Sequence, residues 1–587
     1  MTRIFAASTL YGAMTVAAAV DAGQFGRDDR ERILLVCNNV DIPEVATPLH
    51  RMPGAAAVLA RFHRVVYWND LIYPFHPSLW GPRDEDAPLW RTVMGEKMGI
   101  RPGPLELVVE SIQVKPAQTL CKIFSDATLA VYADGVMSYG PTRNDLPRPI
   151  HGRIGRVLYL DLVPTLLPML LTEYGIPSEP VRTDAVLALM AELTEECRPI
   201  LDRRIPPQLA RNGPQTALLL GQYLSPLGIL TEEEEEDLHR RMFEHAVRLG
   251  HTAVVFKPHP SAPSSLSDAL AAAAREAGVP FLVLDVPVLA ETVFAYLRPR
   301  QVIGCFSTGL FTARALYGIP VAQIGALEVI RRMRPYANSN RIPATLTHAL
   351  VPDLEAGPGA GTEAAATAPA DRILDVEHIR AEVTPYVQAV GYCMQPKRYA
   401  FLRPVAEEYV AAAVEQWEAR PELSMHFNER TRARLELPGP RTWKWRRGLG
   451  WTLRGAGERG EPDELPVTEV TLSGFASLVE AKDDQGILEV GARLLPEHEN
   501  LDLLIGMAQA HIRRKETDQA VRAIERAARI SADSTRALVW LRIAETAAKL
   551  GKQGDDLRRQ AARQALTLNP ASPAAQRLLK SGRLGRR

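Results

Sequence analysis

The feature that most constrains this fold is a pair of successive segments in which short apolar runs alternate with helical patterns. In the first segment, residues 1 to about 205, each run is a few residues long and rich in Val, Ile and Leu. Such runs are typical of strands buried on both faces of a parallel sheet. The segment therefore predicts one Rossmann-like α/β domain. Its expected strands are Ile4–Ala7, Ile33–Cys37, Val65–Tyr67, Leu105–Val109, Leu129–Tyr132 and Val157–Leu160.

The second segment, residues 206 to 350, repeats the pattern and predicts a second doubly wound domain. Two such domains in one chain leave a cleft between them, where ligands usually bind. Helices are expected between the strands, and the first of them begins at Thr231 with an acidic run. That run favours complementarity to the helix dipole over a ligand site. The expected strands are Thr216–Leu220, Ala253–Phe256, Phe281–Leu284, Val302–Cys305 and Val321–Ile324.

The N-terminus has two interpretations. Arg3 followed by the apolar stretch Ile4–Val20 loosely resembles a signal peptide. The alternative is a strand over Arg3–Ala7, a tight loop, and a helix over Gly12–Ala22. We favour the strand, because strand, loop and helix is how a doubly wound domain starts. No apolar run reaches the roughly 20 residues that a membrane span needs.

Charge and cysteine usage exclude several classes of protein. Lys plus Arg and Asp plus Glu both total 69, so no global charge points to nucleic acid or acidic lipid. The five cysteines are widely spaced, odd in number and without a C-x-x-C pair. This spacing argues against a disulfide framework or a zinc site and fits the reducing cytoplasm. We expect the cysteines to be small core residues.

The remaining chain divides into four segments. Residues 351–372 form a low-complexity linker, and residues 373–430 are expected to be helices that pack back on the two domains. Residues 431–466 form a basic linker whose part 441–454 holds three tryptophans. That part could contact the inner face of the cell membrane or a polyanionic glycan, or its tryptophans could dock on the protein.

Residues 467–587 are expected to be helical. Two stretches, Leu503–Ile530 and Leu538–Leu568, each have the pattern of a helical hairpin. Their offset lies near the 34-residue period of the tetratricopeptide repeat. The region is therefore predicted to bind a protein partner or to mediate self-association.

A carboxylate follows one strand of the first domain. Asp134 comes directly after the strand that ends at Tyr132, and Gly135 permits a turn there. Open α/β sheets place ligands at this carboxyl edge. Asp134 could serve as the general base that takes a proton from an attacking hydroxyl. Asp-Gly is also a common turn, and the dipeptide alone does not decide between the two.

A histidine between two prolines follows a strand of the second domain. Pro258 has a fixed φ, and Pro260 keeps His259 out of the helical region. An imidazole held in this way can bond to or protonate a departing phosphate without costly reorganisation. Lys257 adds positive charge nearby or simply faces solvent. The alternative for His259 is a structural histidine.

Ser307 and Thr308 lie between a strand and a helix of the second domain. Helix capping explains them, and the same geometry also binds phosphate through N–H groups and hydroxyls. Gly221 ends the first strand of that domain and lets a ligand approach the backbone. Gln222 beside it could bind a base or a phosphate.

The three motifs, in this order, resemble those of the bacterial sialyltransferases, and most closely the polysialyltransferase family. The acidic motif Tyr132-Ala133-Asp134-Gly135 with its trailing Ser138-Tyr139-Gly140-Pro141 is similar, as are the His-Pro and Ser-Thr motifs. The resemblance covers roughly residues 1 to 345. It implies the GT-B fold, a CMP-activated sialic or related nonulosonic acid as donor, a glycan acceptor, and neither a metal nor another cofactor.

The resemblance also implies roles for residues. Asp134 would be the general base, and His259 the acid and phosphate ligand. Ser307 and Thr308 would hold the CMP phosphate, and the donor side would include Gly221, Gln222, Lys257 and Pro260. One departure is Ala133, where the family has a first acidic residue. The alternatives to a sialyltransferase are a GT-B enzyme with another nucleotide sugar and an inactive scaffold that binds partners through its helical repeats.

Overall fold

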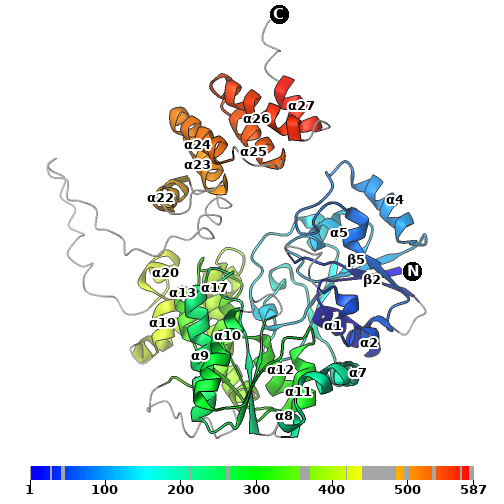
Figure 1. Cartoon of the computed structure of the whole chain (residues 1–587), viewed down its shortest axis with the longest axis vertical. Helices are drawn as coiled ribbons and strands as arrows, with labels where there is room; N and C mark the ends of the chain where they lie inside the picture. Colours follow the sequence, from blue (N-terminus) through cyan, green and yellow to red (C-terminus); the bar gives the residue numbers. More distant parts are fainter. Residues whose placement is uncertain are drawn as a thin grey trace, which may run out of the picture. The chain divides into compact units, whose positions relative to one another are not determined.

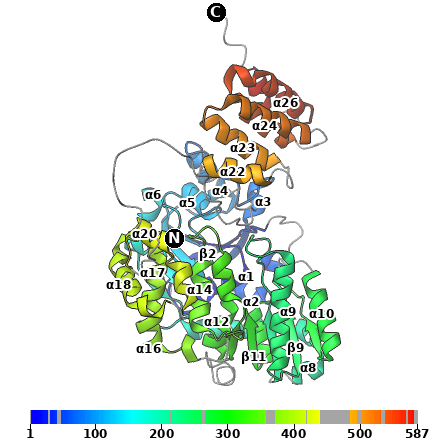
Figure 2. The same cartoon turned by 90° about the vertical axis from the view of Figure 1, so that its left-hand side faces the viewer.

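The computed structural model describes residues 2–26, 30–40, 47–211, 215–259, 265–356, 371–417, 420–438, 484–494, 501–531, 537–568 and 572–580. The chain forms two compact units, residues 1–446 and 447–587 (Figures 1 and 2). The first unit holds both predicted sheets, and the second is helical.

The first domain is built on a parallel sheet of seven strands in the order β3-β2-β1-β4-β5-β6-β7. The order reverses between β1 and β4, which is the topological switch point of a doubly wound sheet. All six strands predicted from the sequence are present. The short strand β7 is additional, because its sequence Ser-Glu-Pro has no apolar run. The strands are β1 (Thr2–Ala7), β2 (Glu31–Val36), β3 (Arg64–Tyr67), β4 (Leu105–Val109), β5 (Thr128–Ala133), β6 (Ile154–Tyr159) and β7 (Ser178–Pro180).

Strand β1 shows why the N-terminal apolar stretch folds as it does. Phe5 packs in one core with α1, whereas Ile4 packs in the core on the other face with α5. Burial of both faces explains the unbroken apolar run. The strand interpretation of the N-terminus is therefore confirmed, although α1 begins two residues earlier than predicted. The helices of this domain are α1 (Leu10–Asp21), α2 (Ala55–Leu59), α3 (Trp68–Ile72), α4 (Ala87–Lys97), α5 (Ala117–Ile123), α6 (Arg148–His151), α7 (Thr183–Arg204) and α8 (Pro207–Arg211).

The second domain is a parallel sheet of five strands in the order β10-β9-β8-β11-β12. All five strands predicted for this segment are present. The order reverses between β8 and β11, as it does between β1 and β4 in the first sheet. Its elements are β8 (Thr216–Leu220), α9 (Glu232–Arg248), β9 (Ala253–Lys257), α10 (Ser265–Ala277), β10 (Phe281–Val283), α11 (Ala290–Leu297), β11 (Gln301–Gly304), α12 (Thr308–Tyr317) and β12 (Val321–Gln323).

The acidic run at the start of α9 has structural partners. Thr231 and Glu234 form a capping box, and Glu234 also pairs with Arg332 at 2.6 Å. Glu235 is buried and accepts hydrogen bonds from the backbone N–H groups of Leu224 and Ser225, both at 2.8 Å. The run therefore fixes the loop after β8 as well as complementing the helix dipole.

The helices that follow the second sheet return to the first domain. The Tyr399 hydroxyl donates to the Met169 carbonyl at 2.8 Å, and Arg398 donates to the Thr142 carbonyl at 2.8 Å. These contacts join the two sheets into one unit, which has the GT-B arrangement. Residues 357–370 of the predicted linker lie outside the described residues. The helices are α13 (Ala326–Arg332), α14 (Arg341–Leu350), α16 (Val376–His378), α17 (Thr384–Met394), α18 (Arg403–Ala412), α19 (Pro421–His426) and α20 (Glu429–Leu435).

The second unit contains two helical hairpins in succession. The hairpins α23–α24 and α25–α26 cover the two stretches predicted from the sequence, and small residues such as Ala508 and Ala544 fill their core. The basic Trp-rich segment 441–454 lies outside the described residues. The helices are α22 (Asp484–Leu494), α23 (Leu501–Arg513), α24 (Thr517–Ile530), α25 (Ala537–Ala548), α26 (Asp555–Leu568) and α27 (Pro573–Lys580).

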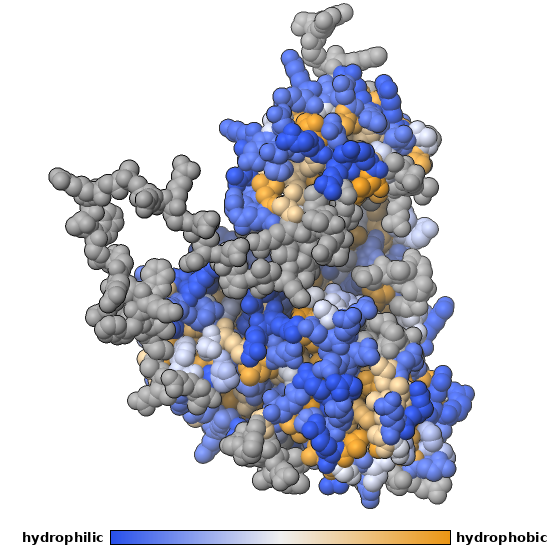
Figure 3. Space-filling model, turned by 60° about the vertical axis from the view of Figure 1, so that its left-hand side comes forward, coloured by the Kyte–Doolittle hydropathy of each residue, from blue (hydrophilic) through white to orange (hydrophobic). Residues whose placement is uncertain are grey.

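All five cysteines are buried and unpaired, as the sequence predicted. Hydrophilic side chains predominate on the face shown in Figure 3, with small apolar patches between them. Among the described helices, none combines the length and apolarity that a membrane crossing requires.

Candidate active site

The residues selected from the sequence lie at the carboxyl ends of the two sheets. Asp134 follows β5 directly, His259 comes two residues after β9, and Ser307 stands between β11 and α12. These strands lie at, or one strand away from, the point where each sheet reverses its order. Doubly wound sheets bind their ligands at this place.

A second carboxylate, which the sequence analysis missed, lies beside Asp134. Val109 is paired with Val131 across β4 and β5, so Glu110 stands opposite Tyr132. Because side chains alternate along a strand, Asp134 lies on the same face as Tyr132. Glu110 thus projects from the neighbouring strand end toward the side where Asp134 lies. Like Asp134, Glu110 comes directly after an apolar run in the sequence, and that pattern could have identified it.

The first strand and helix of the domain hold Glu110 in place. Its Oε1 accepts a hydrogen bond from the backbone N–H of Ser8 at 2.7 Å. Its Oε2 would lie 3.0 Å from a Cβ atom added to Gly12, so a side chain there would press on the carboxylate. Thr9 caps α1 by accepting from the Gly12 N–H at 2.9 Å. The tight start of α1 and the position of Glu110 therefore depend on each other.

Burial raises the pKa of both carboxylates, and the charge of Asp134 adds to the shift of Glu110. Together, burial and this charge raise the pKa of Glu110 to about 7. Two close carboxylates in a poorly solvated place do not both ionise readily. The pair therefore keeps a proton up to near-neutral pH and can exchange it there.

The acidic motif of the first domain touches the Ser-Thr motif of the second. The Thr308 hydroxyl oxygen accepts from the backbone N–H of Val136 at 3.4 Å. A Cβ atom added to Gly135 would lie only 2.8 Å from the same oxygen. Gly135 has an extended backbone that any residue can adopt, so this close approach is what excludes a side chain. The structure thus brings Asp134 and Thr308, predicted from separate motifs, to one junction.

Ser307 is the N-cap of α12, as the capping interpretation predicted. Its hydroxyl oxygen accepts from the Gly309 N–H at 3.1 Å, which leaves its own proton able to donate. The positive end of the α12 dipole lies at the same place. Capping and phosphate binding are therefore compatible here.

Gly221 is required where the end of β8 passes the His-Pro motif. An added Cβ atom would lie 2.9 Å from the Pro258 Cα and 3.0 Å from the His259 nitrogen. The Gln222 backbone N–H donates to the His239 Nε2 at 3.0 Å, and the Gln222 side chain is buried. A role for that side chain in reading a base or a phosphate stays a prediction.

His259 is exposed and stacks on Tyr223, with ring centroids 5.1 Å apart and an angle of 16° between the planes. Partial desolvation lowers the pKa of His259; Glu235 opposes this shift and Lys257 adds to it. The imidazole is consequently neutral near pH 7 until a negative charge arrives beside it. The flanking Pro260 lies outside the described residues.

Lys257 does not face solvent, which was one of the two alternatives. Its ammonium is buried and donates to the Val286 carbonyl at 3.0 Å. Burial lowers its pKa to about 8. Strand β9 extends to residue 257, one residue further than predicted, and this directs the side chain inward.

Three further polar groups come from helices and carry no motif signal: Glu291 and Tyr11 lie near Asp134, and Tyr317 lies near Glu291. Glu291 is buried and accepts from the Thr312 hydroxyl at 2.8 Å; burial raises its pKa, and the charge of Asp134 adds to this. The hydroxyls of Tyr11 and Tyr317 are buried without a hydrogen-bond partner among the described residues. Buried polar groups are normally satisfied, so unpaired hydroxyls at a junction indicate a place for water or ligand.

Sugar transfer to a hydroxyl requires that one group lose a proton while a phosphate departs elsewhere. The first sheet edge carries carboxylates that could accept the proton, and the second carries a helix N-terminus and an imidazole that could receive the phosphate. A glycosyltransferase of GT-B architecture would need these two groups on separate domains. Residues 3–326 match the sequence model of the family Alpha-2,8-polysialyltransferase (POLYST). The chain belongs to this family and is a sialyltransferase-like glycosyltransferase. A nucleotide-sugar donor and a glycan acceptor follow from that membership.

Two solved structures are distantly similar to this chain. A sialyltransferase GT-B domain from Photobacterium damselae is 12% identical, with a TM-score of 0.34, over 60% of this chain and 98% of the other. The E. coli heptosyltransferase WaaC is also 12% identical, with a TM-score of 0.26, over 55% of this chain and 88% of the other. At this level of similarity neither structure assigns a role to a residue here. No curated protein sequence matches the chain.

Proposed function

We propose that this protein is an inverting, metal-independent transferase that moves sialic acid, or a related nonulosonic acid, from a CMP-activated donor to a glycan acceptor. The close approach of the Gly135–Val136 backbone to Thr308 supports the proposal, because Gly135 follows the predicted base and Thr308 belongs to the predicted phosphate site. Family membership and the three motifs support the donor class. The polymerising form of the reaction is compatible with the same site.

On the acceptor side, Asp134 accepts the proton of the attacking hydroxyl. The hydroxyl oxygen forms a bond to the anomeric carbon as that proton leaves. Glu110 makes up for the carboxylate that Ala133 lacks, because it provides the second negative charge from the adjacent strand. Its charge raises the basicity of Asp134, since the interaction between two carboxylates acts on both.

On the donor side, the bond between the anomeric carbon and the CMP phosphate oxygen breaks, and that oxygen retains the electron pair. His259 donates a hydrogen bond to the phosphate, and the negative charge of the phosphate favours protonation of the imidazole. The Ser307 hydroxyl and the N-terminus of α12 stabilise the remaining phosphate charge. Lys257 contributes positive charge from beneath the strand rather than by direct contact.

Calorimetry with CMP and CMP-sialic acid in EDTA tests the donor assignment. We expect both ligands to bind the wild type without added metal. Both should bind the His259→Ala variant more weakly. The matched control is His151→Ala, since His151 also stacks on a tyrosine, at 4.4 Å from Tyr174, in the first domain. Binding of UDP or GDP in place of CMP would contradict the donor class. Absence of all nucleotide binding would contradict the transferase proposal and favour a scaffold.

A further inference from the structure

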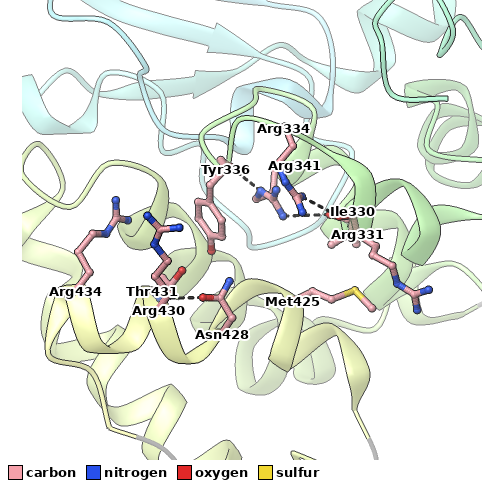
Figure 4. A pocket seen from close by; sticks show the side chains of 10 residues that line it. All are labelled: Ile330, Arg331, Arg334, Tyr336, Arg341, Met425, Asn428, Arg430, Thr431 and Arg434. Carbon is pink, nitrogen blue, oxygen red and sulfur yellow. Dashed lines mark hydrogen bonds between the residues drawn. The ribbon is translucent and has the colours of Figure 1, made fainter. Parts of the chain in front are cut away.

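A pocket of about 450 Å³ lies outside the candidate active site, between the α13–α14 segment and helices α19 and α20 (Figure 4). Its lining is strongly basic. Five of its ten residues are arginines, and none of the ten, all of them within the described chain, is acidic. The arginines are Arg331, Arg334, Arg341, Arg430 and Arg434. None of the residues of the three sequence motifs lines this pocket.

Arg341 supplies a fixed positive charge beneath the pocket. It is 2% exposed and lies over the Tyr336 ring, 4.4 Å from the centroid. Its guanidinium donates to the carbonyls of Tyr336 and Met333 at 2.6 and 2.9 Å. No carboxylate pairs with it in the described part of the chain. Burial, and to a smaller extent the charge of Arg334, lower the pKa of Arg341.

The other four arginines also lack acidic partners among the described residues. Arg332, which stands between two of them in sequence, shows that this is not a shortage of nearby acids. It pairs with Glu234 at 2.6 Å and Glu328 at 3.2 Å on another side of α13. Unneutralised charges of one sign repel each other, so such a group weakens the fold unless an anion compensates it.

The geometry of the pocket favours a ligand over a diffuse ion atmosphere. Arg430 and Arg434 lie one turn apart on α20 and point to the same side of the helix (Figure 4). Asn428 fixes the start of that helix by accepting from the Thr431 N–H at 2.9 Å. A volume of about 450 Å³ falls in the range of small-molecule sites.

We propose that this pocket binds a polyvalent oxyanion, a molecule or chain segment with at least two phosphate or carboxylate groups. Guanidinium groups present two parallel donors that match the oxygens of either group. Two or more anionic groups would engage arginines from both sides of the pocket at once. Tyr336 and Met425 supply an apolar wall for the part of the ligand between the charges.

Two sources could supply such an anion, and the position of the pocket bears on both. Ile342, the residue after Arg341, lies within 3.6 Å of a Cβ atom added to Gly140, in the segment that follows Asp134. A carboxylated glycan held in the pocket would thus run close to the acceptor side. A free phosphate compound would instead act on the same segment as an effector.

Calorimetry with two probes tests the proposal. Inorganic pyrophosphate represents the phosphate source, and a trisaccharide of sialic acid represents the carboxylate source. The test variant is Arg430→Gln with Arg434→Gln, both exposed and on one helix. The control is Arg203→Gln with Arg204→Gln, which removes the same charge from the exposed end of α7.

We expect one equivalent of at least one probe to bind the wild type, and to bind the test variant roughly tenfold more weakly or worse, because two charge-assisted contacts are lost. The control variant and His259→Ala should bind as the wild type does. The probe that binds identifies the source. Equal weakening in both double variants, loss of binding in His259→Ala, or no binding of either probe would overturn the proposal. These results do not depend on whether the protein binds CMP. CMP binding tests the proposed function in a separate experiment.

Discussion

The two sheets of the first unit share the same strand order around their reversal, but the side chains at their carboxyl edges differ in charge. Each reverses its strand order beside its first strand, and in each the candidate site residues follow the strands at the reversal or one strand away. The first edge carries the carboxylates Glu110 and Asp134, both with raised pKa values. The second carries an imidazole whose pKa is lowered, a hydroxyl and a helix N-terminus.

This difference shows that the sheet topology determines where a candidate residue lies, whereas its side chain determines the charge at that place. A parallel sheet delivers whatever residue follows a strand to the same edge. Burial then shifts the carboxylates toward holding protons and the imidazole toward releasing one. Under the proposed function, the first edge would accept a proton and the second would receive a phosphate. Substitutions at the first edge and at the second edge should therefore have different effects on kcat and on CMP binding.

The largest effect is expected at the carboxylate edge. Asp134→Asn removes the proposed base, and kcat should fall by roughly 10²- to 10⁴-fold, the usual contribution of general-base catalysis. CMP binding should remain, because the amide keeps the shape of the side chain. Steady-state kinetics and calorimetry on the same preparation measure both.

A matched control is Asp161→Asn. Asp161 also follows a strand, β6, and burial also raises its pKa, but its charge acts on Tyr139 and Tyr159 rather than on Glu110. Its loss should change kcat by less than about threefold, within the range of ordinary surface substitutions. A similar fall in both variants would mean that the first edge has no specific base.

At the phosphate edge, His259→Ala should lower kcat by roughly 10²- to 10³-fold, the usual effect of losing one donor to a developing negative charge. Unlike Asp134→Asn, it should also weaken CMP binding. If CMP affinity fell in Asp134→Asn and held in His259→Ala, the assignment of the two edges would have to be exchanged.

Glu110→Gln sharpens the comparison within the first edge. In the wild type, Glu110 becomes charged through a pKa of about 7 and then strengthens Asp134 as a base. Activity should therefore rise with pH through this range. In the variant that rise should vanish, with activity on the order of tenfold lower at pH 8 and nearly unchanged at pH 6. A pH profile of kcat measures it.

The same variant has a stability effect of defined sign. The pKa of Glu110 in the folded protein, about 7, lies above its ordinary value of 4.5. The folded state therefore binds the extra proton between these values, and wild-type stability falls as pH rises from 4.5 to 7. Glu110→Gln should be more resistant to urea than the wild type at pH 8, with the difference shrinking toward pH 5. The exposed control Glu96→Gln should show no such trend.

Much of this architecture could be predicted from the sequence. Buried parallel strands are contiguous apolar runs, so all predicted strands of the two sheets are present. β7 could not be predicted, because Ser178–Pro180 has no apolar residue run and is paired only through its neighbour β6. The inward direction of the Lys257 side chain depends on strand β9 being one residue longer than predicted. The ends of strands cannot be predicted from sequence to within one residue.

The candidate site was predictable only in its separate parts. Asp134, His259 and Ser307 follow strands and can be found in the sequence. Glu110 follows a strand as well, but it has no accompanying motif. The meeting of Gly135 and Thr308 depends on how two domains pack, and no local pattern encodes that.

The smallest expected effect tests that meeting directly. Gly135→Ala places a Cβ atom 2.8 Å from the Thr308 hydroxyl oxygen without disturbing an extended backbone. Activity should fall about fivefold, equivalent to about 1 kcal/mol. Thr308→Ala alone loses one long hydrogen bond and should cost about twofold to fivefold, or about 0.5–1 kcal/mol. In the double variant the crowding is relieved, so its loss should be smaller than the product of the two single losses. If the free-energy losses of the two single variants simply added in the double variant, Gly135 and Thr308 would not be in contact in the working enzyme. The two domains would then have to move relative to each other for the two edges to act on one substrate.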